Sequence, residues 1–144
     1  MPEGERVLTL RAPAKINLAL EVLHRRPDGY HEIDTVMTTL DLADRVAIRE
    51  REPGAGLEVV LTGPYAAGID PTQDLAGRAA QLIAEHAGRP ADLRIEVEKR
   101  IPSPAGLGGG SSDAAAVLRG VVNSELVAAL RDDVRGTRKA LERT

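Results

Sequence analysis

The sequence is poor in aromatic side chains, since its 144 residues include two Tyr, no Phe and no Trp. Proteins that bind single-stranded nucleic acid stack the bases on several aromatic rings. The formal net charge of −3 also provides no basic surface for a duplex. A nucleic-acid-binding function is therefore disfavoured. The apolar fraction of 42% is typical of a globular protein, so the core must consist of Leu, Val, Ile and Ala.

The sequence also has no cysteine, which excludes disulfides and thiolate metal sites. The first residues lack the basic and then apolar pattern of a signal peptide. No apolar run approaches the roughly 20 residues that span a bilayer. We therefore expect a soluble cytoplasmic protein with no membrane partner, long enough for one domain and too short for two ordinary ones.

Alternation of apolar and polar residues predicts a series of strands. Ala12-Pro13-Ala14 interrupts the alternation, because proline cannot donate to a strand ladder. Turns are predicted at residues 26–29 and 53–56, where Pro and Gly occur together. The predicted strands are residues 6–11, 16–22, 33–40, 45–49, 57–61 and 93–97.

Helical spacing of apolar residues predicts a helix over residues 75–87, with Asp74 as its N-cap and Gly88 as its stop. Residues 111–113, Ser-Ser-Asp, are cap-type residues that predict a second helix from Ala114. The tail over residues 124–143 is charged and helix-prone. Strands come mostly first, followed by helix, strand, glycine-rich run and helix, and this order predicts an α+β fold.

The glycine-rich run at residues 106–110 lies between the last predicted strand and the second predicted helix. Glycine lets the backbone approach an anion closely, and the free N–H groups at a helix start favour a phosphate there. Ser111 and Ser112 can donate hydrogen bonds to the phosphates or help hold Mg²⁺. The run is not a Walker A loop and fits a dinucleotide fingerprint poorly. A tightly turned connection without a ligand is the alternative.

Three motifs resemble those of the GHMP kinases, the galactokinase, homoserine kinase, mevalonate kinase and phosphomevalonate kinase superfamily. They are residues 12–18 (APAKINL), 28–33 (DGYHEI) and 104–115 (PAGLGGGSSDAA). The second motif resembles the branch that phosphorylates 4-diphosphocytidyl-2-C-methyl-D-erythritol in non-mevalonate isoprenoid synthesis. The resemblance extends from about Leu8 to Gly120.

The resemblance implies a mixed or antiparallel sheet with a left-handed βαβ unit, helices on one face, and ATP with Mg²⁺ as cofactors. It implies phosphoryl transfer to a hydroxyl of a small substrate, the cytidine-diphosphate-linked methylerythritol. Lys15 corresponds to the catalytic lysine, Asn17 to its neighbour on the substrate side, and Tyr30 and His31 to the residues at the cytosine. The ATP-binding set would be Pro104, Ala105, Gly106, Leu107, Gly108, Gly109, Gly110, Ser111 and Ser112, with Ser112 also at the metal.

Each role has an alternative without a ligand. Lys15 can be a solvent-facing strand charge, and Tyr30 with His31 can pack in a turn. The remaining polar residues have structural interpretations: His24 and His86 have no partner at ligand spacing and are ordinary surface or helix residues. A solvated face is expected for Asp34, Asp41 and Asp44.

The chain departs from the family at Asp74, where members carry Asn, so a negative charge is expected near the adenine. Downstream, the segment that carries the family's catalytic aspartate is not found, and Asp133 lacks its flanking residues. We expect residues 1–120 to form the ATP- and substrate-binding domain and residues 121–144 to be a helical tail, a truncated or aberrant remnant. Self-association is expected through the surface that the missing part leaves exposed. The alternatives are a catalytically incomplete nucleotide-binding fragment and a GHMP kinase for another small alcohol.

Overall fold

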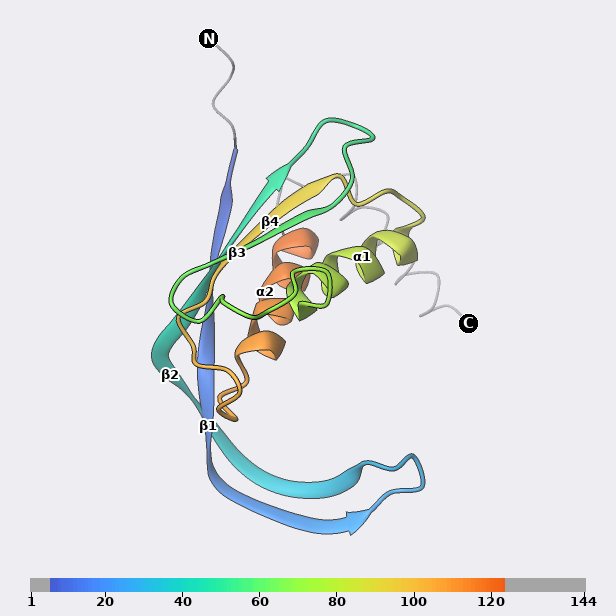
Figure 1. The fold of residues 1–144 in the computed structure, drawn as a ribbon. Helices are drawn as coiled ribbons and strands as arrows, with labels where there is room; N and C mark the ends of the chain where they lie inside the picture. Colours follow the sequence, from blue (N-terminus) through green and yellow to red (C-terminus); the bar gives the residue numbers. More distant parts are fainter. Residues whose placement is uncertain (1–5, 124–144) are drawn as a thin grey trace.

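The computed structural model describes residues 6–123 as a four-stranded mixed sheet with two helices on one face (Figure 1). The sheet order is β1-β2-β4-β3; β1, β2 and β4 pair antiparallel, whereas β3 is parallel to β4. The parallel pair is joined through α1, a β–α–β crossover. The elements are β1 (Leu8–Arg25), β2 (His31–Glu50), β3 (Glu58–Thr62), α1 (Leu75–Ala87), β4 (Leu93–Glu98) and α2 (Gly109–Asn123). The α+β prediction is confirmed.

The first two strands are longer than predicted, because β1 and β2 run without a break through the positions where interruptions were expected. Pro13 lies inside β1 opposite Ala43, with a register shift between Pro13 and Lys15. β1 is an edge strand, so a residue without an N–H leaves no neighbour unpaired on its outer side. The interruption predicted at residues 12–14 is therefore present as a shift in the pairing with β2, but the strand does not end there.

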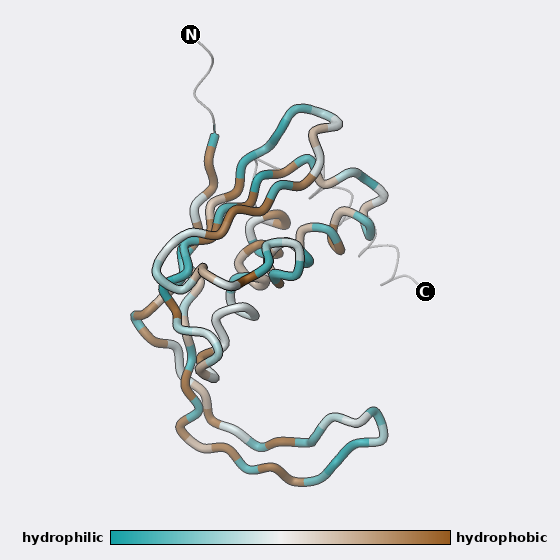
Figure 2. Tube along the Cα trace, in the orientation of Figure 1, coloured by the Kyte–Doolittle hydropathy of each residue, from teal (hydrophilic) through white to brown (hydrophobic). Residues whose placement is uncertain are grey.

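The distal half of the β1–β2 hairpin extends beyond the helices and curves into an arm (Figure 1). Apolar residues continue along this arm, as the brown segments of Figure 2 show. Their side chains are exposed: Leu18, Leu20, Val22, Leu23, Tyr30, Ile33, Val36 and Met37. The sheet therefore buries its apolar residues only where the two helices cover it, and not along the arm.

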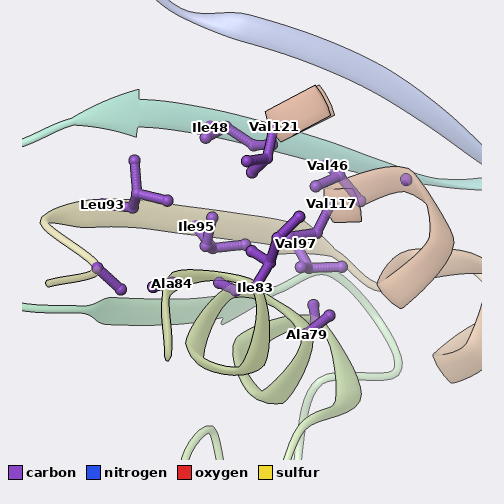
Figure 3. Packing of buried hydrophobic residues seen from close by; sticks show 14 of the residues in the cluster. Val46, Ile48, Ala79, Ile83, Ala84, Leu93, Ile95, Val97, Val117 and Val121 are labelled. Atoms are coloured by element: carbon purple, nitrogen blue, oxygen red, sulfur yellow. The ribbon is translucent and has the colours of Figure 1, made fainter. Parts of the chain in front are cut away.

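The core lies between the sheet and the two helices, where side chains of β2 and β4 meet those of α1 and α2 (Figure 3). Ile48 and Ile95 are its largest fully buried residues, and Val117 and Val121 of α2 are fully buried as well. As expected from the lack of aromatics, the core consists of aliphatic side chains. Its buried members are Ala12, Val46, Ile48, Ala76, Ala79, Ala80, Ile83, Ala84, Ala91, Leu93, Ile95, Val97, Ala116, Val117 and Val121.

The first helix has the predicted bounds. The Asp74 carboxylate accepts the Ala76 N–H at 3.1 Å, and Gly88 ends the helix with a φ of 68°. The second helix begins at Gly109, so the prediction that residues 111–113 precede it was wrong; they are its third to fifth residues. It continues through residue 120, the expected domain boundary, to Asn123, so residues 121–123 belong to α2; the rest of the predicted tail, residues 124–144, lies outside the described residues. Neither α1 nor α2 is long and apolar enough to cross a membrane.

Candidate phosphate-binding site

The starts of α1 and α2 face one cavity of about 550 Å³. On one side the wall is the glycine-rich loop with the first residues of α2, and on the other it is Asp74 and Leu75 at the start of α1. Lys99 and Ile101, just after β4, lie between them, and Asp44 and Asp70 also contribute to the lining. Eight of the nine predicted ATP-binding residues, 104–111, line this cavity, whereas Ser112 does not. The sequence therefore located the loop that forms its wall.

The loop fits this place only with glycine. Gly106 and Gly108 have φ of 68° and 69°, in the left-handed region that favours glycine. A Cβ on Gly108 would lie 3.1 Å from Cγ of Lys15, and one on Gly109 would lie 3.2 Å from Ile101. The Ser112 N–H donates the first helical hydrogen bond, to the Gly108 carbonyl at 2.9 Å. The N–H groups that precede it have no carbonyl acceptor within the helix, which makes this helix start suited to an anion.

Lys15 does not line the cavity but lies against the loop that forms its wall. Its backbone N–H donates to the Leu107 carbonyl at 2.9 Å, and its aliphatic stem packs on Gly108. The ammonium donates to Oδ1 of Asn17 at 2.8 Å, and the Asn17 amide in turn donates to the Thr35 hydroxyl at 2.8 Å. Two neighbouring strands thus orient one cation beside the loop. Lys15 and Asn17, which were predicted to share a corner of the site, do lie together.

Tyr30 and His31 lie at the far end of the hairpin arm. The Tyr30 side chain is 75% exposed, and its backbone N–H donates to the Asp28 carboxylate at 3.0 Å within the turn. Neither residue lines the cavity. The structure therefore separates the predicted cytosine-contacting pair from the predicted phosphate loop, and the arm connects them (Figure 1).

Lys99 is buried between the two helix starts. Its ammonium donates to Asp113 Oδ2 at 2.7 Å and contacts Asp74 Oδ1 at 3.0 Å, and all three side chains are at least 94% buried. Burial acts to lower the pKa of Lys99, but the hydrogen bonds and charges of Asp113 and Asp74 outweigh it and raise this pKa. The negative charge expected at Asp74 is therefore compensated within the protein.

Asp44 is the third buried carboxylate of this region. Its Oδ1 accepts the N–H groups of Arg100 and Ile101 at 2.7 and 2.9 Å, which fixes the chain where it enters the loop. The solvated position expected for Asp44 was wrong, because the residue is 1% exposed, while Asp34 and Asp41 are exposed as predicted.

Asp44 and Asp113 face each other with one oxygen each, Oδ2 and Oδ1, that receives no other donor. Burial raises the pKa of Asp113 to about 7; contact with Asp44 adds to the rise and the Lys99 ammonium opposes it. A single proton held between the two carboxyls satisfies both oxygens, as in other closely spaced carboxyl pairs. Sequence reasoning missed Asp44, Lys99 and Asp113 as a group.

The family comparison matches the same region. Residues 74–131 match the model described as the GHMP kinases N terminal domain. The 4-diphosphocytidyl-2-C-methyl-D-erythritol kinase of Geobacillus thermodenitrificans is 48% identical over 114 residues, 79% of this chain and 39% of that protein. The enzyme of the same name from Bacillus licheniformis is 50% identical over 111 residues, 77% of this chain and 37% of that protein. The chain thus spans about two fifths of the length of these curated relatives.

Solved structures give the same result. A crystal structure of 4-(cytidine 5'-diphospho)-2C-methyl-D-erythritol kinase superposes with a TM-score of 0.61 at 44% identity, over 88% of this chain and 46% of that one. Homoserine kinase from Cytophaga hutchinsonii gives 0.60 at 13% identity, over 92% of this chain and 42% of that one, which shows a shared fold. Residues 6–123 thus have the fold of the N-terminal domain of the GHMP kinases, the family whose model matches residues 74–131.

Proposed function

We propose that this domain binds ATP with Mg²⁺ in the cavity between α1 and α2, for phosphorylation of a hydroxyl of 4-diphosphocytidyl-2-C-methyl-D-erythritol. The observation that carries the proposal is the contact of Lys15 with the glycine loop, because it puts an oriented cation beside a helix start suited to phosphate. The relatives that carry this enzyme name match the chain at 48% and 50% identity, which supports the substrate.

The phosphates are the part of the nucleotide for which the residues fit best. Two helix starts face the cavity, and each contributes roughly half a positive elementary charge. The glycines at 106 and 108 admit a close approach, and the Ser111 hydroxyl lies in the wall as a donor. Lys15 would compensate charge that develops on the transferred phosphoryl oxygens. Asn17 would keep that ammonium in place.

Magnesium would enter with the nucleotide. Within residues 6–123 no group of three or more His, Cys, Asp or Glu side chains is arranged to hold a metal ion. The carboxylates of Asp74 and Asp113 are engaged by Lys99. The ion would therefore rest on the phosphates, with a hydroxyl of Ser112 or Ser111 as the ligand from this chain, and would screen the phosphate charge.

The arm is the proposed place for the cytidine end of the substrate. Tyr30 offers an exposed aromatic face, and His31 next to it offers a donor and an acceptor, which suits a pyrimidine ring. The substrate would then lie along the concave side of the arm, with its acceptor hydroxyl toward Lys15.

Removal of the acceptor proton is not assigned to any residue in 6–123. The carboxylates that line the cavity are Asp44, Asp70 and Asp74. Asp44 and Asp74 hold backbone N–H groups, and Asp70 accepts from both the N–H and the hydroxyl of Thr72. Nucleotide binding by this domain is therefore supported more directly than turnover, and a nucleotide-binding fragment without turnover is the second candidate function.

Binding and turnover are tested separately. We expect the purified chain to bind ATP–Mg²⁺ in calorimetry, and Lys15→Met to weaken this binding about tenfold while its stem stays packed on Gly108. The matched control is Arg45→Met, which removes an exposed cation of β2 that pairs opposite Arg11 rather than beside the glycine loop. Unchanged ATP affinity in Lys15→Met would contradict the assignment of Lys15.

Turnover is followed as ADP released with 4-diphosphocytidyl-2-C-methyl-D-erythritol. Release that disappears in Lys15→Met supports the kinase, whereas ATP binding without release supports the nucleotide-binding fragment. Tyr30→Ala is expected to weaken CDP binding and leave ATP binding unchanged, because Tyr30 lies in the turn at the far end of the arm, away from the glycine loop. Failure of the wild-type chain to bind either nucleotide at millimolar concentration would overturn the proposed function.

A further inference from the structure

We propose that Lys99 is a positioning residue that serves as the internal counter-charge of the phosphate site. Its ammonium holds the starts of α1 and α2 beside the cavity and neutralises the aspartates there. Anion binding therefore depends on a lysine that pairs with protein carboxylates and not with the anion itself. The inference rests on the proposed nucleotide binding and adds to it a residue that the sequence motifs do not mark.

The backbone of Lys99 is fixed from both sides. Its N–H donates to the Thr62 carbonyl at 2.8 Å, and its carbonyl accepts the Tyr65 N–H at 3.2 Å. The close approach of Gly63 completes this anchor, because a Cβ at Gly63 would lie 2.8 Å from the Lys99 carbonyl oxygen. The side chain therefore starts from a point defined by the ends of β3 and β4.

From that point the ammonium reaches both helices at once. It bonds Asp113, the fifth residue of α2, and Asp74, the N-cap of α1. Asp74 uses its other oxygen to accept the Ala76 N–H, so the same carboxylate caps α1 and fastens it to Lys99. A change at Lys99 is therefore transmitted to the two helix starts that form opposite walls of the cavity.

The charges show why this lysine matters for an anion. Within residues 6–123, Lys99 is the one cation among four buried charged residues, the others being Asp44, Asp74 and Asp113. Below about pH 7, where Asp113 keeps its proton, the set carries a net charge of about −1; without Lys99 it carries about −2 beside the cavity. Each helix start offers roughly +0.5. Removal of the lysine thus turns a site near neutrality into one that repels phosphates.

The test measures how affinity depends on ligand charge. AMP, ADP, ATP and inorganic tripolyphosphate are titrated into the full chain and into Lys99→Met. We expect ATP and tripolyphosphate to lose about tenfold or more in affinity and AMP to lose clearly less, because repulsion grows with ligand charge. Lys99→Arg keeps the charge and is expected to retain the ATP-to-AMP affinity ratio.

Neutralising the partners is the decisive control. In the triple variant Lys99→Met, Asp74→Asn, Asp113→Asn the site carries no lysine and two fewer carboxylates, and we expect ATP affinity to recover at least fivefold over Lys99→Met. Asp74→Asn alone keeps the helix cap, since Asn caps as well as Asp. It is expected to tighten ATP binding more than AMP binding. This variant decides the proposal if Lys99→Met does not fold.

The outcomes are distinguishable. An equal loss for AMP and ATP in Lys99→Met, without recovery in the triple variant, would show that Lys99 only supports the fold, and would overturn the inference. An unchanged ATP-to-AMP ratio in Asp74→Asn would do the same. Failure of the wild-type chain to bind any of the four ligands would overturn the proposed function itself, and the inference with it.

Discussion

Replacement of Asp113 by Asn should change how the stability of this domain depends on pH. Asp113 is fully buried, and burial raises its pKa from 3.8 to about 7. The folded state therefore binds a proton that the unfolded state has lost over the range from about pH 4 to pH 7. Within that range the free energy of unfolding must fall as the pH rises, because ionisation is easier in the unfolded chain.

The magnitude follows from the two pKa values. The slope approaches about 1.4 kcal/mol per pH unit where only the folded state holds the proton. Between pH 5 and pH 8 the wild-type domain should lose about 3 kcal/mol through Asp113 alone. Asparagine cannot ionise, and its amide can donate to Asp44 Oδ2 while its oxygen accepts from Lys99, so it reproduces the protonated carboxyl. The variant lacks this dependence.

The assay is urea unfolding of both proteins at pH 5, 6, 7 and 8, with the difference in free energy of unfolding plotted against pH. Other titrating groups contribute equally to both proteins and cancel in the difference. We expect Asp113→Asn to gain about 3 kcal/mol relative to wild type from pH 5 to pH 8. The control Asp34→Asn, at an exposed strand position, should give a flat difference. Parallel curves for Asp113→Asn, or a relative loss at high pH, would refute the shared-proton arrangement.

Two glycines give further predictions. Gly108→Ala should lower ATP affinity in calorimetry at least about fivefold, because the new Cβ would lie 3.1 Å from Lys15 Cγ. The control Gly54→Ala has a similar φ of 86° but no atom near the new Cβ. It should therefore lower stability and leave ATP affinity unchanged. Equal ATP affinities in the two variants would contradict the role of the loop contact. Gly77→Ala should destabilise the domain by about 1–3 kcal/mol in urea unfolding, because its Cβ would lie 2.7 Å from Val59 Cγ2. The addition of Val59→Ala should recover part of that loss, and strictly additive effects would argue against the contact.

Local sequence signals were sufficient to predict the bounds of an element that carries its own start and stop residues. The apolar spacing of α1, with Asp74 before it and Gly88 after it, predicted both ends of the helix. Local signals failed to predict the bounds where contacts with another element determine them. Pro13 is tolerated because β1 lies at the sheet edge, and α2 starts with Gly109 and Gly110, poor helix formers. Packing of these glycines on Ile101 and Leu75 accompanies that start, and such contacts are invisible in a single sequence.

The glycine loop and the position of Lys15 beside it were accessible from the motifs, but the relation of the loop to α1 was not. The separation between residues 74 and 106 in the chain conceals that both line one cavity. The parallel pairing of β3 with β4 brings them together, since it returns the chain to the same end of the sheet after α1. Strand pairing of this kind depends on long-range contacts and has no local signature.

The burial of the charged residues, by contrast, could have been predicted by extending the apolar periodicity of the strands and of α2 by one more position. The apolar period of β4 continues from Val97 to Lys99, and that of β2 extends back from Val46 to Asp44. In α2 the spacing of the buried residues places Asp113 on the same stripe as Val117. When a charged residue occupies the position where the next buried apolar residue would fall, either the strand or helix becomes solvent-exposed there or the charge is itself buried. Three such charged residues that meet at one end of a sheet and include both signs favour burial, because each charge can then pair with one of opposite sign.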